Sequence, residues 1–143
     1  MQHNELIYLF KKNLLSQKRK FEEYLDLLEC EKETINKEEA DILLDQINLE
    51  NAIVKDIETF QKFIEPLEKR FYASPFKKDT EIISLKNALK NIRTKVIQKS
   101  NHNKNILLDL MIDLKSKIRS IKKQNWNIPF RSEAKPVYVD ITT

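Results

Sequence analysis

The sequence contains no glycine, only four prolines and a single cysteine, and these scarcities exclude several classes of protein. Tight hairpin turns and phosphate-cradling loops use glycine for positive φ, so we expect helix along nearly the whole chain. Cys30 cannot form an internal disulfide, which suits a reducing cytoplasm. No signal-peptide pattern opens the chain, and no apolar run approaches the roughly 20 residues that a membrane helix needs. We therefore expect a cytoplasmic protein without membrane insertion.

Side chains suited to catalysis or metal binding are equally sparse. The two histidines, His3 and His102, lie on different segments, and neither has a cysteine or carboxylate at a spacing typical of metal ligands. No serine lies in the context of a nucleophile elbow, and Cys30 falls off the apolar stripe of its segment. We expect no catalytic residue, no metal and no cofactor, and therefore no enzyme.

Apolar side chains recur at alternating spacings of three and four, which is typical of amphipathic helices. They predict helices over about residues 4–35, 37–72 and 80–125. The segments between these helices are short, and short connections favour antiparallel neighbours. We therefore expect an all-α fold: an elongated up-down-up three-helix bundle or coiled coil, made of an antiparallel hairpin and a long C-terminal helix. We expect one helical-bundle domain over residues 1–125, followed by a partly disordered, flexible tail over residues 126–143.

Three residues bear on where the predicted helices begin and end. Asn36, followed three residues later by Glu39, forms a weak capping box that predicts a second helix starting near residue 37. Asp79 can cap the third helix. Pro66 lacks a backbone donor and would either bend or end the second helix, and the periodicity leaves both outcomes open.

The second and third predicted helices each lose their apolar stripe at one point. If they run antiparallel from the turn near residue 75, the asparagines of the third helix lie opposite the polar stretch of the second. Coinciding polar gaps favour a buried polar layer that fixes the register of the two helices. A solvent-facing notch used by a partner is the alternative. The residues assigned to this layer are Asn48, Glu50, Asn51, Asn101 and Asn103.

Charge is distributed unevenly along the chain. Residues 1–73 carry 11 basic and 16 acidic side chains, whereas residues 74–143 carry 15 and 6. We favour a basic third helix that lies against an acidic hairpin and fixes their pairing electrostatically. A basic strip is also the usual footprint of nucleic-acid binding. Because Asp109 and Asp113 interrupt the lysines and no nucleic-acid motif occurs, we expect no nucleic-acid partner.

The end of the third helix and the tail carry apolar side chains that the bundle has little means to cover. The same residue count places the third helix beyond the hairpin from about residue 116, and an uncovered apolar strip usually binds a partner. The tail either orders on such a partner or folds back to cap the bundle's own groove. The candidate partner-binding residues are Leu110, Leu114, Ile118, Ile121, Trp126, Ile128, Phe130, Val137, Tyr138, Val139 and Ile141.

Two stretches resemble the FlgN family of flagellar type III export chaperones. "FEEYLDLLECEKETINKEEADILLDQINLENAIVKDIETF" is similar to the first hairpin of that family, and "SNHNKNILLDLMIDLKSKI" to its asparagine-rich entry into an apolar terminal helix. The likeness spans about residues 5–122. The matching positions are Leu27, Leu28, Glu29, Glu31, Ile35, Leu43, Leu44, Asn101, Asn103, Asn105, Leu107, Leu108 and Leu110.

The resemblance implies a chaperone that binds amphipathic terminal helices of hook–filament junction proteins, prevents their premature association and delivers them to the flagellar export gate. A client helix would lie along the third helix while Trp126, Phe130 and Tyr138 close over it. We expect a monomer or a weak homodimer. The acidic face around Glu29, Glu31, Glu38 and Glu39 is the candidate contact for the export gate. The alternative function is a structural coiled-coil scaffold that associates with its own copies.

Overall fold

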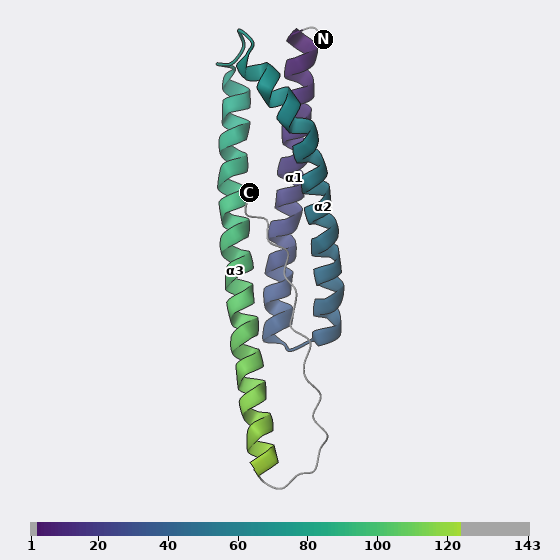
Figure 1. Ribbon diagram of the computed structural model, residues 1–143, viewed down its shortest axis with the longest axis vertical. Helices are drawn as coiled ribbons and strands as arrows, with labels where there is room; N and C mark the ends of the chain where they lie inside the picture. Colours follow the sequence, from purple (N-terminus) through teal and green to yellow (C-terminus); the bar gives the residue numbers. More distant parts are fainter. Residues whose placement is uncertain (1–2, 124–143) are drawn as a thin grey trace.

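The computed structural model describes residues 3–123, and within that range the chain forms three long helices and no strand. They are α1 (His3–Asn36), α2 (Ala40–Tyr72) and α3 (Thr80–Lys123). The helices alternate in direction and lie side by side in an elongated bundle (Figure 1). The expected all-α, up-down-up architecture is confirmed. The predicted tail over residues 126–143 lies outside the described residues.

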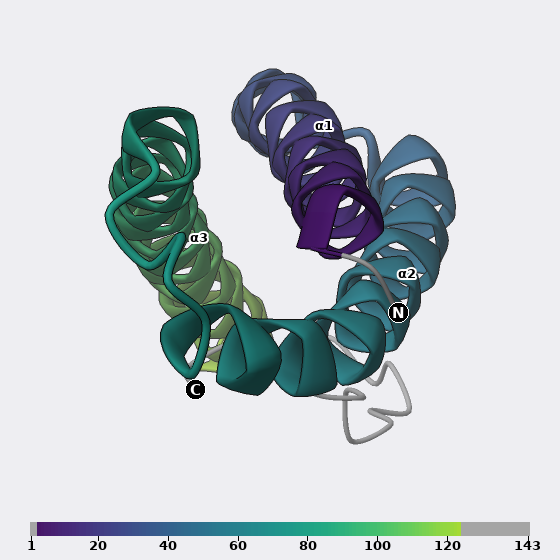
Figure 2. The same cartoon turned by 90° about the horizontal axis from the view of Figure 1, so that it is seen from above.

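The central helix of the bundle is α1. It packs against both α2 and α3, whereas the backbones of α2 and α3 stay apart over the described residues, and the end-on view in Figure 2 shows α1 between its two neighbours. The expected packing of the third helix against the hairpin is therefore found, but it is made by α1, and direct backbone packing of α3 on α2, as the polar-layer count assumed, does not occur over the described residues. The reason is the composition of α1, whose long, broad apolar stripe contacts two helices at once.

The core follows the predicted stripe of α1 closely. Phe10, Phe21 and Tyr24 have at most 1% of their surface exposed, and Phe10 meets Phe71 of α2 edge to face at 5.2 Å between ring centroids. The remaining core residues are Leu14, Leu28, Val54, Ile57, Ile64, Ile82, Leu89 and Val96. Aromatic and aliphatic side chains at this level of burial supply most of the stability of a narrow bundle.

The turn between α1 and α2 differs from the predicted capping box. α1 continues through Asn36, and α2 begins only after Glu39, whose side chain makes no capping hydrogen bond. The Glu39 amide donates to the carbonyl of Thr34 at 3.2 Å, the six-to-one bond of a Schellman motif. That motif needs one residue with positive φ, and Glu38 takes this role at φ 56° because the chain offers no glycine.

The other end of the bundle shows the expected cap. Asp79 Oδ1 accepts a hydrogen bond from the backbone amide of Ile82 at 3.1 Å, so Asp79 caps α3 as predicted. Pro66 does not end α2, which continues to Tyr72. The last turns of α2 lean across towards the start of α3 (Figures 1 and 2), and proline within these turns gives the bend a physical cause.

Candidate partner-binding surface

The buried face of α3 continues past the end of the hairpin. Along α3 the residues that face α1 are spaced by three or four positions, through Val96, Ser100, Asn103 and Leu107. Leu107 is the last buried side chain of α3 up to Ile121, the last residue whose exposure is described. Beyond it the same spacing brings Leu110, Leu114, Ile118 and Ile121 onto the continuation of that face. We call these four residues the apolar strip.

The apolar strip lacks the cover that α1 gives to the upstream part of α3. Figure 1 shows α3 extending beyond the turn that joins α1 to α2. Leu114 and Ile121 are each 40% exposed, and Leu110 and Ile118 are half-buried. Aliphatic side chains at helical spacing on a projecting helix form a surface on which the apolar face of another helix can pack.

A second pair of apolar side chains lies on another side of the same segment. Leu108 and Ile112 are one turn apart and more than half exposed. Their positions place them roughly opposite the apolar strip around the helix axis. The projecting part of α3 is therefore apolar on two sides, and only the apolar strip continues the face that packs in the bundle.

Seven of the eleven candidate partner-binding residues belong to the tail. They lie outside the described residues and are Trp126, Ile128, Phe130, Val137, Tyr138, Val139 and Ile141. The four residues that α3 contributes are brought together on one face, as the apolar strip. The predicted surface thus begins where the bundle's own core ends.

The five residues assigned to the polar layer have different environments. Glu50 and Asn103 are fully buried, Asn51 is half-buried, and Asn48 and Asn101 are exposed. The contacts of the buried two run through α1. Asn103 Nδ2 donates to the backbone carbonyl of Leu28 at 2.9 Å, and Glu50 Oε1 accepts a hydrogen bond from the Tyr24 hydroxyl at 2.5 Å.

A second buried carboxyl, Glu31 of α1, completes this region. Its side chain is 0% exposed, and neither of its oxygens has a hydrogen-bond partner among the described residues. We call Tyr24, Glu31, Glu50 and Asn103 the buried polar cluster. Glu31 cannot belong to the acidic surface expected to contact a partner, because it faces the interior together with Glu50.

Burial shifts the ionisation of every titratable group in the buried polar cluster. Loss of hydration, followed by the negative charge of Glu50, raises the pKa of Glu31 to about 8 from its usual 4.5. Burial also raises the pKa of Glu50, against the opposing effects of the Tyr24 hydroxyl and of the positive charge on Lys104. Burial raises the pKa of Tyr24 far above its usual value, so its hydroxyl remains a donor at neutral pH.

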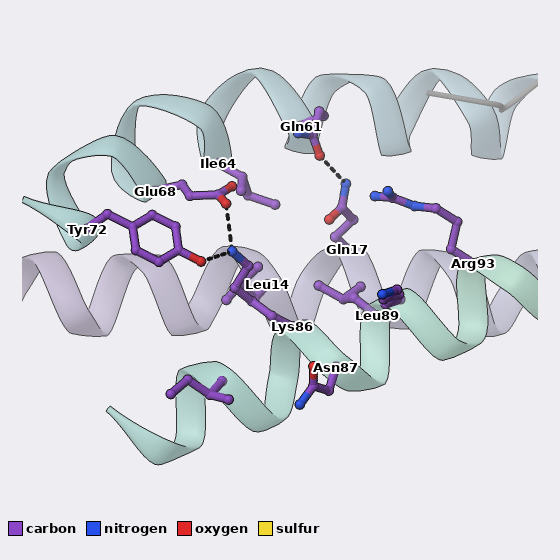
Figure 3. Close-up of a pocket in the computed structure, with 12 residues that line it drawn as sticks. Leu14, Gln17, Gln61, Ile64, Glu68, Tyr72, Lys86, Asn87, Leu89 and Arg93 are labelled. Atoms are coloured by element: carbon purple, nitrogen blue, oxygen red, sulfur yellow. Dashed lines mark hydrogen bonds and ion pairs between the residues drawn. The ribbon is translucent and has the colours of Figure 1, made fainter. Parts of the chain in front are cut away.

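A separate cavity of about 510 Å³ lies near the other end of the bundle and is lined by residues of α1, α2 and α3. Lys86 of α3 crosses it to bond Glu68 at 2.6 Å and the Tyr72 hydroxyl (Figure 3). Gln17 donates to Gln61 across the same space at 3.1 Å. Lys86 thus bridges α3 to α2, and Gln17 bridges α1 to α2. Of the apolar side chains in the lining, Leu14, Ile64 and Leu89 are buried, and Ile83 is exposed. The cavity therefore offers a partner helix little apolar area.

Ion pairs between helices partly follow the predicted charge asymmetry. Lys99 of α3 pairs with Glu29 of α1, and Lys86 pairs with α2, so basic residues of α3 do contact the acidic hairpin. One bridge has the opposite sense, because Lys11 of α1 contacts Glu81 of α3 at 2.7 Å. Most of these pairs are partly exposed, so each contributes little to stability.

The described part of the chain shows neither a metal centre nor a membrane span. Within residues 3–123, no group of three or more histidine, cysteine or carboxylate side chains is placed to hold a metal ion. No helix in this range combines the length and the apolar composition that crossing a bilayer requires.

Comparison with known proteins finds no family model, no curated protein and no solved structure that matches the chain.

Proposed function

We propose that the chain is a cytoplasmic chaperone that binds an amphipathic helix of a partner protein along the apolar strip of α3. The supporting observation is that the core-facing side of α3 extends beyond the hairpin with Leu114 and Ile121 each 40% exposed. Exposed apolar area of this kind favours association, because packing against another helix removes it from water.

The partner we propose is a terminal helix of a hook–filament junction protein, and the second contact is the flagellar export gate. This assignment depends on the resemblance of residues 5–122 to the FlgN family. The architecture suits such a role: the first part of α3 packs on α1, and the projecting part presents the apolar strip to a helix that lies alongside it. Terminal helices with an apolar face need such a cover until they are assembled.

A peptide titration tests the proposal directly. A labelled peptide covering the terminal helix of a hook–filament junction protein of the source cell is titrated with the full chain, and fluorescence anisotropy reports binding. Leu114→Ala and Ile118→Ala together should weaken binding by about 2 kcal/mol, or about thirtyfold, because each change removes aliphatic area from the interface.

The opposite side of the same helix supplies a matched control. Leu108→Ala and Ile112→Ala remove the same chemistry at greater exposure, and should leave peptide affinity within about twofold because they lie off the strip. Equal weakening by both double variants would remove the apolar strip from the account. Circular dichroism of each variant verifies that the helices are intact.

The second candidate function is a self-associating coiled-coil scaffold. The observation that favours it is the second exposed apolar pair, Leu108 and Ile112, which gives the projecting segment two sides for pairing. A scaffold should form stable oligomers at micromolar concentration in sedimentation velocity. A chaperone of the proposed kind should sediment as a monomer or a weak dimer.

A further inference from the structure

Two carboxyl groups from different helices face each other inside the bundle. Glu31 comes from α1 and Glu50 from α2, and both are 0% exposed. We call them the carboxyl pair. Buried carboxyls in a helical core normally have charged or hydrogen-bonding partners, because loss of hydration is costly for an ionised group. The hydrogen bonds around this pair therefore decide which charge state it can hold.

The described residues supply too few donors for two ionised carboxylates. The Tyr24 hydroxyl donates to one oxygen of Glu50, but the other oxygen of Glu50 and both oxygens of Glu31 have no donor. The Asn103 amide donates to the Leu28 carbonyl and also acts on Glu31, where it partly opposes the rise in pKa, but it is one amide for three acceptor oxygens. A proton on one carboxyl supplies the missing donor, because its O–H can bond an oxygen of the other.

The charges that face the pair agree with a single bound proton. The titratable groups here are Tyr24 and Glu31 on α1, Glu50 on α2 and Lys104 on α3; the Tyr24 hydroxyl is uncharged, and the positive charge of Lys104 acts on Glu50. One lysine charge and one shared proton balance two carboxyl groups. Loss of the proton leaves an uncompensated negative charge in the core. Burial raises the pKa of both carboxyls, and the negative charge of Glu50 raises that of Glu31 further.

The carboxyl pair lies where α3 is about to leave the bundle. Asn103 is the contact of α3 at this level, and Leu107 is the only buried residue of α3 that follows it up to Ile121. A three-residue turn joins α1 to α2 five residues after Glu31 and ten residues before Glu50, so the separation of these two helices is restricted. Repulsion within the pair is therefore relieved most easily by displacement of α3.

We propose that the carboxyl pair is a proton-binding site that controls how firmly this part of α3 is held against the hairpin. With one proton bound, Asn103 and Leu107 stay packed on α1. When the proton is lost, water enters to hydrate the two carboxylates, and α3 separates from about Ser100 onward. Proton binding and the separation of α3 require no partner protein. The consequence for a client, a longer accessible apolar strip at higher pH, rests on the proposed function.

Amide hydrogen exchange of the full chain without a partner tests the site. Protection factors, corrected for the intrinsic pH dependence of exchange, are compared at about pH 6 and pH 8.5. Residues 100–110 should lose protection by about tenfold or more, the equivalent of one pKa unit, while residues 82–96 keep theirs. Glu31→Gln should abolish the loss, because glutamine fills the same space without ionising.

Two controls separate the carboxyl pair from other titrating groups. Glu33→Gln removes an exposed carboxylate two residues away, and His102→Gln removes the exposed histidine on the same part of α3. Both should behave like the wild type. The proposal is overturned if the wild type shows no change, if Glu31→Gln shows the same loss, or if His102→Gln abolishes it. It is also overturned if residues 82–96 lose protection equally, which would indicate global unfolding.

If Glu31→Gln does not fold, an NMR titration of the glutamate carboxyl resonances of the wild type tests the same proposal. In chain labelled with ¹³C at glutamate side chains, one resonance assigned to Glu31 or Glu50 should titrate above about pH 6, well beyond the usual glutamate range. If both titrate at ordinary values, no proton is shared and the site does not exist. Peptide binding is not measured in either experiment, so failure here leaves the proposed function untouched.

Discussion

Replacing Glu31 by glutamine should stabilise the protein at neutral and alkaline pH. Glu31 is fully buried, and neither of its oxygens has a donor, so the ionised form is poorly accommodated in the folded state. Glutamine occupies nearly the same volume and carries no charge. The change therefore removes an electrostatic penalty while keeping the packing of α1 against its two neighbours.

The size and sign of the effect follow from the raised pKa of Glu31. A carboxyl with a pKa of about 8 in the folded protein and 4.5 in the unfolded chain binds more protons when folded, so its stabilising contribution is present below pH 4.5 and is lost as the pH rises to 8. At about 1.36 kcal/mol per pKa unit, the loss is at most about 5 kcal/mol. That is a large fraction of the roughly 5–15 kcal/mol that stabilises an ordinary domain.

Urea unfolding followed by circular dichroism at pH 5, 6, 7 and 8 measures this effect. The free energy of unfolding of the wild type should fall with pH relative to that of Glu31→Gln, so the gap between the two should widen by several kcal/mol. Glu33→Gln, an exposed change on the same helix, should run parallel to the wild type. Parallel curves for the wild type and Glu31→Gln would refute the reasoning, because they would show that Glu31 has an ordinary pKa.

Three further changes test other parts of the structure. Glu38→Gly should raise the free energy of unfolding, measured by thermal unfolding, by about 1 kcal/mol, because Glu38 holds a positive φ that glycine adopts without strain. The control Glu39→Gly, at φ −89°, should give no gain in stability. Tyr24→Phe should destabilise by about 1–3 kcal/mol, because it removes the hydroxyl that donates to Glu50; unchanged urea unfolding would contradict that bond. Lys86→Met should lower the melting temperature by a few degrees in low salt and by less in 1 M NaCl, because the ion pair that Lys86 forms between α3 and α2 is only partly buried and is screened by salt. An equal decrease at both salt concentrations would show that Lys86 stabilises the bundle by packing rather than by charge.

Periodicity alone predicted the helices and most of the core. The spacing of three and four predicted an apolar stripe along α1, and Phe10, Phe21 and Tyr24, which lie at that spacing, are buried. Such spacing fixes which face of a helix is buried because the helical repeat is constant. It does not fix which neighbour covers that face, so the periodicity did not identify α1 as the helix of the hairpin on which α3 packs.

The buried polar cluster was only partly predictable from the sequence. Glu50 and Asn103 interrupt the stripes of their own helices, and this interruption revealed them. Glu31 occupies an apolar position on α1 between Leu28 and Ile35, and a carboxylate at a core position of a regular stripe was the available signal. Its significance depends on Glu50 lying opposite, which is a property of the tertiary packing rather than of local spacing.

The turn beside Glu38 shows a different limit. A box formed by Asn36 and Glu39 fits a helix start, but the hydrogen bonds that end α1 compete for the same residues. The C-terminal motif prevails, because it satisfies carbonyls of α1 and reverses the chain within three residues. A glycine at position 38 would have indicated this turn from the sequence, but the chain contains no glycine.

The proposed binding of partner helices along the apolar strip is tested most directly by capture from the cytoplasm of the source cell. Tagged full chain, the double variant Leu114→Ala with Ile118→Ala, and a form ending at Gln124 are compared, with bound proteins identified by mass spectrometry. We predict that the full chain recovers hook–filament junction proteins and that the double variant loses them. The form ending at Gln124 separates the contribution of the tail from that of α3. Equal recovery by the double variant, or recovery of the chain's own copies alone, would contradict the account.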